Sequence, residues 1–350
     1  MQKNNGIVGF THYSGEDIYL FTLRNIKGTE VCISNYGAII TSFKVPGSDG
    51  IVNDIVLGFD KVEDYLSGEY LDGYPYFGAA IGRYANRIKN GEFKVDGEKY
   101  TLKKNKTTDH LHGGENGFDK KVWKCHSISE TTVMLTYKSM DGEEGYPGTL
   151  DSMLAFELTD NNELIYEFTA STDKPTAINL THHSYFNLND GYGTINDHWV
   201  RINSPAILEQ DANFVVTGKT IPVKDTFYDF RQLRSISKTW NGKDGYDQSF
   251  VLEEKSPVDP LTGLTLAAEA FSEQSKLKLE VYTDEPLVHF YTGRWIPPVK
   301  GKNGNNYGSF SGFCFETHKH PNAINIPHFP NTILRPGEVY QSKTMYRIIQ

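Results

Sequence analysis

Two segments far apart in the chain carry side chains suited to proton transfer. Residues 179–187 read NLTHHSYFN and place His183 among hydroxyl and amide groups, and residues 312–318 read GFCFETH and place Glu316 inside an apolar strand pattern. The ordinary pKa of an imidazole, about 6.5, lies near neutrality, so a histidine exchanges protons readily. A carboxylate in a buried strand must be paired or hydrogen-bonded, because burial of a lone charge is costly. We therefore consider Glu316 and His183 candidate catalytic groups, with a structural ion pair at Glu316 as the alternative.

Strand periodicity predicts how these side chains are presented. Because side chains alternate between the two faces of a strand, His183 and Tyr185 are expected on one face and His182 on the other. The same rule places Cys314 and Glu316 together, opposite two phenylalanines. An isolated histidine on a strand is often a hydrogen-bonded core residue, so His183 gains its functional interpretation from the polar residues around it.

Two arginines and two further polar residues could hold a ligand. Residues 82–88 read GRYANRI, where Arg83 and Arg87 offer forked donors for hydroxyls or carboxylates and Asn86 offers both a donor and an acceptor. At least one of the two arginines is expected to brace a loop instead. Asp247, in DGYDQSF, is an ordinary turn acid when it is considered alone.

Two histidine pairs raise the alternative of a metal site. His110 and His112 are two residues apart, as are His318 and His320, which would put each pair on one face of a strand, a spacing found in metal sites. A metal-dependent β-sandwich or cupin-like enzyme is thus a rival interpretation. The two glycines after His112 and the missing downstream acid and glycine spacing of cupins argue against it, and we expect no metal.

Composition excludes several classes of function. The 350 residues include 35 basic and 44 acidic side chains, for a formal net charge of −9, whereas a nucleic-acid binder needs a basic surface. Three cysteines stand far apart, which predicts neither a disulfide framework nor a zinc knuckle. The first 17 residues lack an apolar signal region, and no apolar run is long enough to span a bilayer. We expect a cytoplasmic protein that binds neither membranes nor nucleic acids.

The predicted elements are mostly strands. The aromatic content of 13% suits β cores, and it also suits sugar binding, because flat rings cover the C–H faces of pyranoses. The Asp96-Gly97 pair predicts a hairpin with a type I′ turn, and a polar loop at 159–163 predicts a second hairpin. Apolar alternation predicts strands at residues 31–34, 38–45, 93–95, 99–102, 153–158, 164–168, 277–282 and 287–292.

Helical signals are few. Residues 60–66, with Gly68 as a stop, and residues 230–237 are the candidates for short helices. A Gly- and Asn-rich stretch at 301–306 is expected to be a surface loop and not a domain boundary. Many strands with too few helices to cover them predict an all-β protein, built as one large antiparallel β-sandwich domain over residues 1–350.

An ordered set of motifs resembles the aldose 1-epimerase, or galactose mutarotase, family. The similarity extends from about residue 30 almost to the C-terminus, and so many ordered matches are far more specific than any single motif. The segments that carry the resemblance are, in order, GRYANRI, LHGGENGFDK, DGEEGYPG, NLTHHSYFNL, GYDQSF, FYTG, SGFCFET and LRPGE.

The resemblance implies a galactose mutarotase-like β-sandwich that interconverts the α and β anomers of free aldohexoses such as galactose and glucose. It implies Glu316 as general base and His183 as general acid, beside His182, where the family usually has asparagine. No redox cofactor or metal is implied. The sugar-contacting positions implied by the resemblance are Asn86, Arg87, His112 and Asp247, together with His289, at a position where the family varies.

Two rival functions within the same fold stay open. An enzyme acting on hexose 6-phosphates would need extra cations at the rim of the cleft, for which Arg83 and Arg294 are the candidates. A non-catalytic sugar-binding module would keep the aromatic residues without the acid and base, so the presence of both Glu316 and His183 argues against it. The sequence does not distinguish galactose from glucose as the preferred substrate, and it is silent on the oligomeric state.

Overall fold

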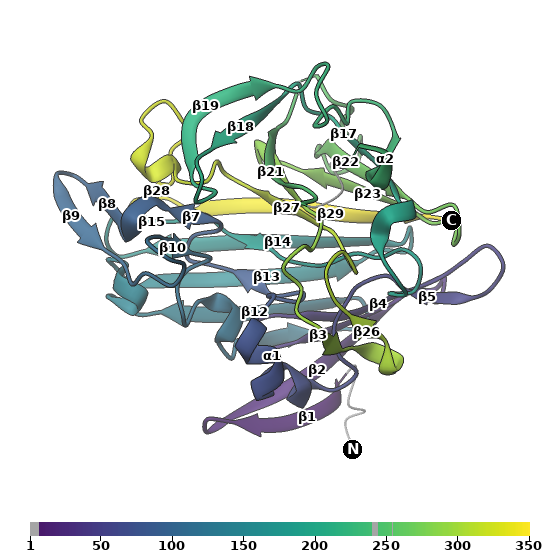
Figure 1. Ribbon diagram of the computed structural model, residues 1–350. Helices are drawn as coiled ribbons and strands as arrows, with labels where there is room; N and C mark the ends of the chain where they lie inside the picture. The colour runs from purple at the N-terminus through teal and green to yellow at the C-terminus, as the bar shows by residue number, and fades with distance from the viewer. Residues whose placement is uncertain (1–6, 240–243, 254) are drawn as a thin grey trace.

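The largest element of the protein is a nine-stranded antiparallel sheet that crosses the centre of the molecule (Figure 1). The computed structural model describes residues 7–239, 244–253 and 255–350. In spatial order the strands of this sheet are β11 (Lys124–Ile128), β12 (Thr132–Ser139), β13 (Leu150–Leu158), β14 (Glu163–Thr172), β29 (Tyr340–Ile349), β23 (Lys278–Thr283), β22 (Thr265–Phe271), β17 (Trp199–Ile202) and β20 (Arg234–Ser235).

Two five-stranded antiparallel sheets accompany it, and the second carries part of the site described below. The first consists of β1 (Ile7–Tyr13), β2 (Glu16–Arg24), β3 (Glu30–Ser34), β4 (Ile40–Pro46) and β5 (Val52–Asp54). The second consists, in spatial order, of β19 (Val216–Pro222), β18 (Ala206–Gln210), β21 (Asp247–Val251), β24 (Leu287–Tyr291) and β27 (Cys314–His318).

Short two-stranded ladders lie outside these three sheets. They pair β16 (Thr181–His182) with β6 (Ala80–Ile81), β10 (His110–Leu111) with β7 (Arg87–Ile88), β8 (Glu92–Val95) with β9 (Glu98–Thr101), β15 (Thr176–Ala177) with β28 (Ile333–Leu334), and β25 (Val299–Lys300) with β26 (Asn306–Tyr307).

One continuous apolar core joins the three large sheets. It includes Phe43 of β4, Phe168 of β14 and Phe315 of β27, all buried. Along β13 the exposed and part-exposed side chains alternate with fully buried ones, as expected for a strand with one face on the core. The predicted all-β sandwich is therefore confirmed.

Both predicted hairpins are present. β8 and β9 are joined by Asp96 and Gly97, which both have positive φ, as a type I′ turn requires. β13 and β14 are antiparallel, and their pairing begins at Leu158 and Leu164, on either side of the predicted loop at 159–163. The predicted strands 277–282 and 287–292 correspond to β23 and β24, but these belong to different sheets, so the corner at Glu285-Pro286 carries the chain from the nine-stranded sheet to the five-stranded one.

The helix predictions were only partly correct. Residues 60–66 contain the 3₁₀ turn η1 (Val62–Leu66), but Gly68 begins a new helix, α1 (Gly68–Gly73), because the Ser67 side chain caps it by accepting the Tyr70 N–H. Residues 230–237 are mostly not helical: β20 occupies part of this range, and only its end enters α2 (Ile236–Thr239). Among the described residues, no helix has the length and apolar character needed to cross a bilayer.

The remaining helical elements are single 3₁₀ turns in loops. They are η2 (Lys89–Gly91), η3 (Phe118–Lys120), η4 (Glu143–Gly145), η5 (Ile195–Asp197), η6 (Lys302–Gly304) and η7 (Ala323–Asn325). The predicted surface loop at 301–306 contains η6, and it is docked more firmly than expected, since buried Lys302 pairs with Asp54 at 2.7 Å and donates to the Thr41 carbonyl.

Arg83 is the arginine that braces a loop. Its guanidinium is buried and donates to the Ser139 hydroxyl and to the carbonyls of Ser139, Met140, Pro147 and Gly148, all at 2.8–3.1 Å. These acceptors lie at the end of β12 and in the connection to β13. The brace therefore anchors the segment that leads from Arg83 into β7.

Replacement of Arg83 by lysine should destabilise the protein. A lysine offers three donors on one atom and cannot reach all of these acceptors, and unmet bonds to a buried charged group each cost about 1.5–3 kcal/mol. We expect Arg83→Lys to lower the free energy of unfolding by about 3 kcal/mol in urea denaturation. Arg231→Lys, at an exposed pair with Asp229, is the matched control and should change it by less than about 1 kcal/mol. Equal stabilities of the two variants would contradict the brace.

Candidate active site

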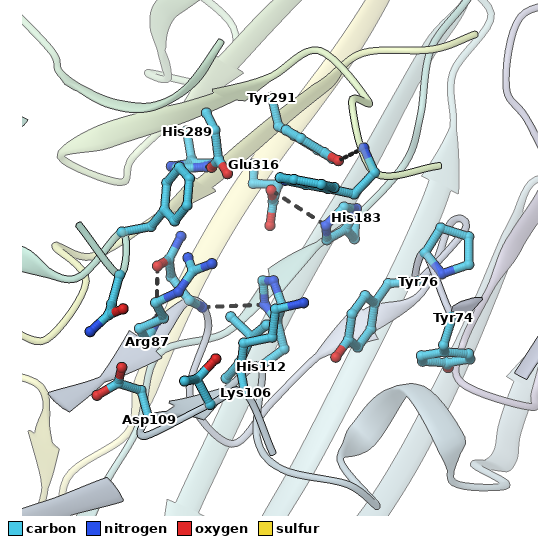
Figure 2. Close-up of a pocket in the computed structure, with 18 of the residues that line it drawn as sticks. Tyr74, Tyr76, Arg87, Lys106, Asp109, His112, His183, His289, Tyr291 and Glu316 are labelled. Carbon is cyan, nitrogen blue, oxygen red and sulfur yellow. Dashed lines mark hydrogen bonds and ion pairs between the residues drawn. The ribbon is translucent and has the colours of Figure 1, made fainter. Parts of the chain in front are cut away.

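A cavity of about 410 Å³ lies where β7, β10, β21, β24 and β27 converge with the loops around them (Figure 2). This volume is in the range of about 300–1,000 Å³ that small-molecule sites occupy. The structure brings all seven site residues predicted from the sequence to its wall: Asn86, Arg87, His112, His183, Asp247, His289 and Glu316.

Glu316 stands in the middle of β27, opposite His289 of β24 in the strand register. Its side chain is only 2% exposed, and its Oε1 lies 3.6 Å from the Nε2 of His183. Among the described residues, its Oε2 has no hydrogen-bond partner. Burial raises the pKa of Glu316 to about 7, because the ionised form loses its hydration.

His183 directly follows β16; Thr181 and His182 pair with β6, and Phe186 forms isolated bridges with Val56 and Phe313. The expected alternation nevertheless holds for the side chains, since His183 and Tyr185 line the cavity and His182 does not. Its Nδ1 lies 3.5 Å from the Sγ of Cys314, and its ring stacks on Tyr76 with the centroids 5.8 Å apart. Burial lowers the pKa of His183 to about 3.

The two opposite pKa shifts have one cause and one consequence. Removal from water disfavours the charged form of each group. Because the two groups interact, they titrate as a pair that can hold a proton either on the carboxyl group of Glu316 or on His183. Their facing atoms are 3.6 Å apart, and the free Oε2 faces no competing donor among the described residues. The arrangement is suited to giving up one proton at one point and accepting another nearby.

Arg87, the first residue of β7, lines the cavity (Figure 2), and so does Asn86 directly before it. The Arg87 guanidinium lies over the ring of Phe214, 5.4 Å from its centroid, and within the described chain no carboxylate is close enough to form an ion pair with it. The Asn86 side-chain oxygen accepts the Arg87 backbone N–H at 2.9 Å. Arg87 therefore keeps its forked donors for a ligand.

His112 is held in one orientation by the same segment. The backbone N–H of Asn86 donates to the His112 Nδ1 at 3.3 Å, so the neutral ring carries its proton on Nε2. Burial lowers the pKa of His112 well below its ordinary value, and the charge of Arg87 acts in the same direction. The glycine after it is required, because a Cβ on Gly113 would lie 1.7 Å from the Gly82 carbonyl oxygen.

Asp247 is oriented by a chain of hydrogen bonds from β24. The His289 Nε2 lies 2.8 Å from the Asp247 Oδ1, and the His289 Nδ1 lies 2.9 Å from the Ser249 hydroxyl. Although burial alone would raise the pKa of Asp247, the hydrogen bond from His289 and the charge of Arg87 bring its pKa below the ordinary value. Both nitrogens of His289 are thus engaged by protein groups, which leaves the Asp247 carboxylate as the acceptor that faces a ligand.

Within the part of the chain that the structure describes, a metal ion has one geometrically possible site, formed by His112, His183 and Glu316. One ligand atom from each lies within 4.8 Å of the others. The hydrogen bonding does not match a metal, however, because the Asn86 N–H occupies the His112 Nδ1 and leaves the ring proton on the nitrogen that would have to coordinate. The charge of Arg87 would add repulsion. We conclude that this donor set is poorly matched to a resident cation.

The histidine pairs predicted to share a strand face do not do so. His110 points away from the cavity: its Nδ1 lies 2.6 Å from the Lys103 carbonyl oxygen, and its Nε2 lies 2.7 Å from the Tyr146 hydroxyl. A positive φ at His112 turns the chain and breaks the alternation. His318 is the last residue of β27 and His320 lies beyond the strand, and neither lines the cavity.

Aromatic residues complete the wall, and sequence reasoning did not single them out. Tyr76 packs on both His112 and His183, and the Tyr291 hydroxyl accepts the Trp295 N–H at 2.6 Å. Phe214 covers Arg87. The only sequence signal for Tyr76 and Phe214 was the high aromatic content of the chain, whereas Tyr291 stands in the FYTG motif.

Three comparisons with known proteins agree with this architecture. The family model described as aldose 1-epimerase matches residues 19–347. Galactose mutarotase from Homo sapiens is 41% identical over 321 residues, 91% of this chain and 90% of that protein. Aldose 1-epimerase from Escherichia coli (strain K12) is 34% identical over 343 residues, 96% of each chain.

Solved structures give the same result. The crystal structure of galactose 1-epimerase from Lactobacillus acidophilus NCFM matches with a TM-score of 0.84 at 28% identity and covers 98% of both chains. That of an aldose epimerase homologue from C. elegans matches with a TM-score of 0.87 at 29% identity and covers 95% of this chain and 98% of its own.

His182, the neighbour of the candidate acid, should make stability depend on pH. It is fully buried between the Ala38 carbonyl and the Ser184 hydroxyl, and burial lowers its pKa to about 4. In the unfolded chain the imidazole of His182 has its ordinary pKa of about 6.5, so it binds a proton at pH values where the folded chain does not. The free energy of unfolding therefore falls as the pH falls below about 6.5. From about pH 7.5 to about pH 5, wild type should lose about 2 kcal/mol more than His182→Asn in urea denaturation.

The matched control for this comparison is His126→Asn, on the exposed side of the edge strand β11. Its free energy of unfolding should follow that of the wild-type protein at both pH values. If His182→Asn lost as much stability on acidification as the wild-type protein does, His182 would not be a neutral core residue.

Proposed function

Because the chain belongs to the aldose 1-epimerase family, we propose that it interconverts the α and β anomers of free aldohexoses such as galactose and glucose, with Glu316 as base and His183 as acid. The observation that carries the proposal is the 3.6 Å approach of these two buried groups on one wall of a sugar-sized cavity. The hydroxyl oxygen O1 and the ring oxygen O5 of a pyranose are bonded to the same carbon. An acid and a base that serve both atoms must therefore lie close together.

Ring opening uses one proton transfer at each of these oxygens. Glu316 takes the proton of the C1 hydroxyl while His183 gives a proton to O5, so the C1–O5 bond breaks and the C1–O1 bond becomes a carbonyl. Rotation about the C1–C2 bond then exposes the other face of the aldehyde to the O5 hydroxyl. Closure reverses both transfers: O5 attacks C1, His183 recovers its proton, and Glu316 returns a proton to O1.

The remaining residues of the cavity hold the sugar while C1 turns. Arg87 and the Nε2–H of His112 donate to hydroxyls, and Asp247 accepts from them, so the C2–C6 part of the chain stays in place during the rotation. The aromatic rings of Tyr76 and Phe214 supply flat apolar surface for the C–H groups of the sugar. Since an aldohexose is neutral, the acidic net charge of the protein does not impede its entry.

Neither of the two arginines considered for a hexose 6-phosphate site lines the cavity. Arg83 is buried in the brace and does not line the cavity. Arg294 forms an ion pair with Asp244 and lies over the Trp295 ring, 4.5 Å from its centroid. Among the described residues that line the cavity, the carboxylates of Asp109, Asp247 and Glu316 outnumber the cations Arg87 and Lys106. This balance favours a neutral sugar over a phosphorylated one.

Loss of either proton-transfer group should slow the reaction without abolishing binding. A positioned acid or base contributes about 10²–10⁴-fold, so we expect Glu316→Gln and His183→Gln each to reduce kcat by about that factor when the anomerisation of freshly dissolved α-D-galactose is followed by polarimetry. The double variant should be little worse than either single one, because the two groups act as a unit.

Glu157→Gln and His126→Gln, both exposed on the nine-stranded sheet, are the matched controls. Wild-type kcat in Glu316→Gln would refute its role, and galactose binding without any rate enhancement would favour the non-catalytic module.

The choice of substrate class has its own test. With three carboxylates and two cations at the wall, kcat/KM for glucose should exceed that for glucose 6-phosphate by at least about tenfold, measured by the same polarimetric assay. Mutation of Lys106, the exposed cation at the cavity, to alanine should leave kcat/KM for glucose unchanged. A preference for the phosphorylated sugar that disappears in Lys106→Ala would reverse the assignment.

A further inference from the structure

We propose that Trp295 is a substrate-binding residue whose indole ring stacks on one face of the sugar ring held in the cavity. The inference deepens the proposed function and rests on it, because it takes the aldohexose as the ligand. Its binding part can be measured in a variant that lacks the base Glu316, so it does not depend on turnover.

Trp295 stands at the tip of a hydrogen-bonded turn that follows β24. The Ile296 N–H donates to the Gly293 carbonyl at 3.2 Å, which places Arg294 and Trp295 at the two central positions of a β-turn. The Tyr291 hydroxyl accepts the Trp295 N–H at 2.6 Å (Figure 2), and Ile296 is buried next to it. The backbone that carries the indole is therefore held in place before a ligand binds, which lowers the entropic cost of using the ring for binding.

The two faces of the indole have different surroundings. The guanidinium carbon of Arg294 lies over the ring, 4.5 Å from its centroid, and the guanidinium is held there by an ion pair with Asp244. Trp295 lines the cavity, whereas neither Arg294 nor Asp244 does, so the cation covers the face that is turned away from the cavity. Trp295 is 59% exposed, and among the described residues no other aromatic ring packs against it. One face of a fixed, flat apolar ring is thus left for a ligand.

A pyranose is the kind of ligand that can use such a face. Its hydroxyl groups point mostly outward around the edge of the ring, while C–H groups lie on its two faces. The groups that can hydrogen-bond to those hydroxyls are Arg87, His112 and Asp247, and they share the cavity wall with Trp295. Contact between the C–H groups and the indole removes apolar surface of both partners from water. A single exposed tryptophan is ordinary on a protein surface, but here it belongs to the wall of a polar cavity.

Kinetics of variants that keep or remove the aromatic face test the stacking. Trp295→Leu keeps an apolar side chain without a flat ring, and it should raise KM for galactose about five- to tenfold. Its kcat should change less than about twofold, because stacking acts on the bound sugar and on the transition state alike. Trp295→Phe should stay within about twofold of the wild-type KM. Trp199→Leu, at a partly exposed tryptophan of β17, is the matched control and should leave both constants unchanged.

Two kinetic outcomes would overturn the proposal. One is an equal KM in Trp295→Leu and Trp295→Phe, which would make the residue a mere apolar part of the rim. The other is a loss confined to kcat, which would place the residue in the chemical step and not in binding. Since Trp295 is largely exposed, both variants should unfold at the same urea concentration as the wild-type protein, and this measurement excludes a general loss of structure.

Tryptophan fluorescence tests the contact without turnover. In Glu316→Gln, galactose should change the tryptophan emission in a saturable way, because the indole of Trp295 exchanges water for the sugar. The change should disappear in Glu316→Gln/Trp295→Phe and persist in Glu316→Gln/Trp199→Phe. A change that survives in the Trp295→Phe background, or the lack of any change in Glu316→Gln, would overturn the proposal.

This readout separates the inference from the proposed function. If the wild-type protein gave no rate enhancement while the emission of Trp295 still responded to galactose, the proposed function would fail and the stacking would stand. If the wild-type protein accelerated anomerisation while the emission did not depend on Trp295, the proposed function would stand and the stacking would fail.

Discussion

Burial of a carboxyl group and an imidazole in the wall of one cavity is the constraint on which the rest of the site depends. With Glu316 and His183 almost fully removed from bulk water, neither is stabilised in its charged form, and their pKa values shift in opposite directions from the ordinary ones. With pKa values of about 7 and about 3, the carboxyl group of Glu316 holds a proton more readily than His183 does. Opening and closure of a hemiacetal depend on the balance between these two proton affinities, because each group must be an acid in one half of the reaction and a base in the other.

The β-sheet supplies the precision that this balance requires. The register of β21, β24 and β27 places Asp247 opposite Tyr291 and His289 opposite Glu316, so three residues from distant parts of the sequence face one cavity. Strand positions are set by backbone hydrogen bonds, and a slip of one residue would turn all of these side chains to the core. By contrast, Asn86 and His112 rely on short ladders and turns, which the Arg83 brace and the close approach of Gly113 to Gly82 hold in place.

The sequence predicted those parts of the protein that follow from local patterns. The alternation of apolar and polar side chains, together with the turn residues, predicted the β-sandwich, the two hairpins and the shared face of Cys314 and Glu316. The resemblance to the family predicted the seven residues that meet at the cavity. Patterns could not show that His110 turns away, since a positive φ at His112 depends on the packing of the neighbouring chain. Nor could they show that Arg83 is enclosed by carbonyls 56 to 65 residues away, or that Tyr76 packs on His183. Such contacts join segments that are unrelated in sequence.

The same burial has a consequence for the whole fold. His182, His183 and His318 have lowered pKa values, so each weakens the folded state as the pH falls below about 6.5. Glu285 and Glu316 have pKa values raised to about 7, so each weakens it as the pH rises from about 4.5. Between these limits the unfolded chain binds more protons at the histidines and the folded chain binds more at the acids, and the two effects oppose each other. Buried imidazoles with lowered pKa values and buried carboxyl groups with raised pKa values in the same fold therefore offset much of the pH dependence that either kind of group would impose alone.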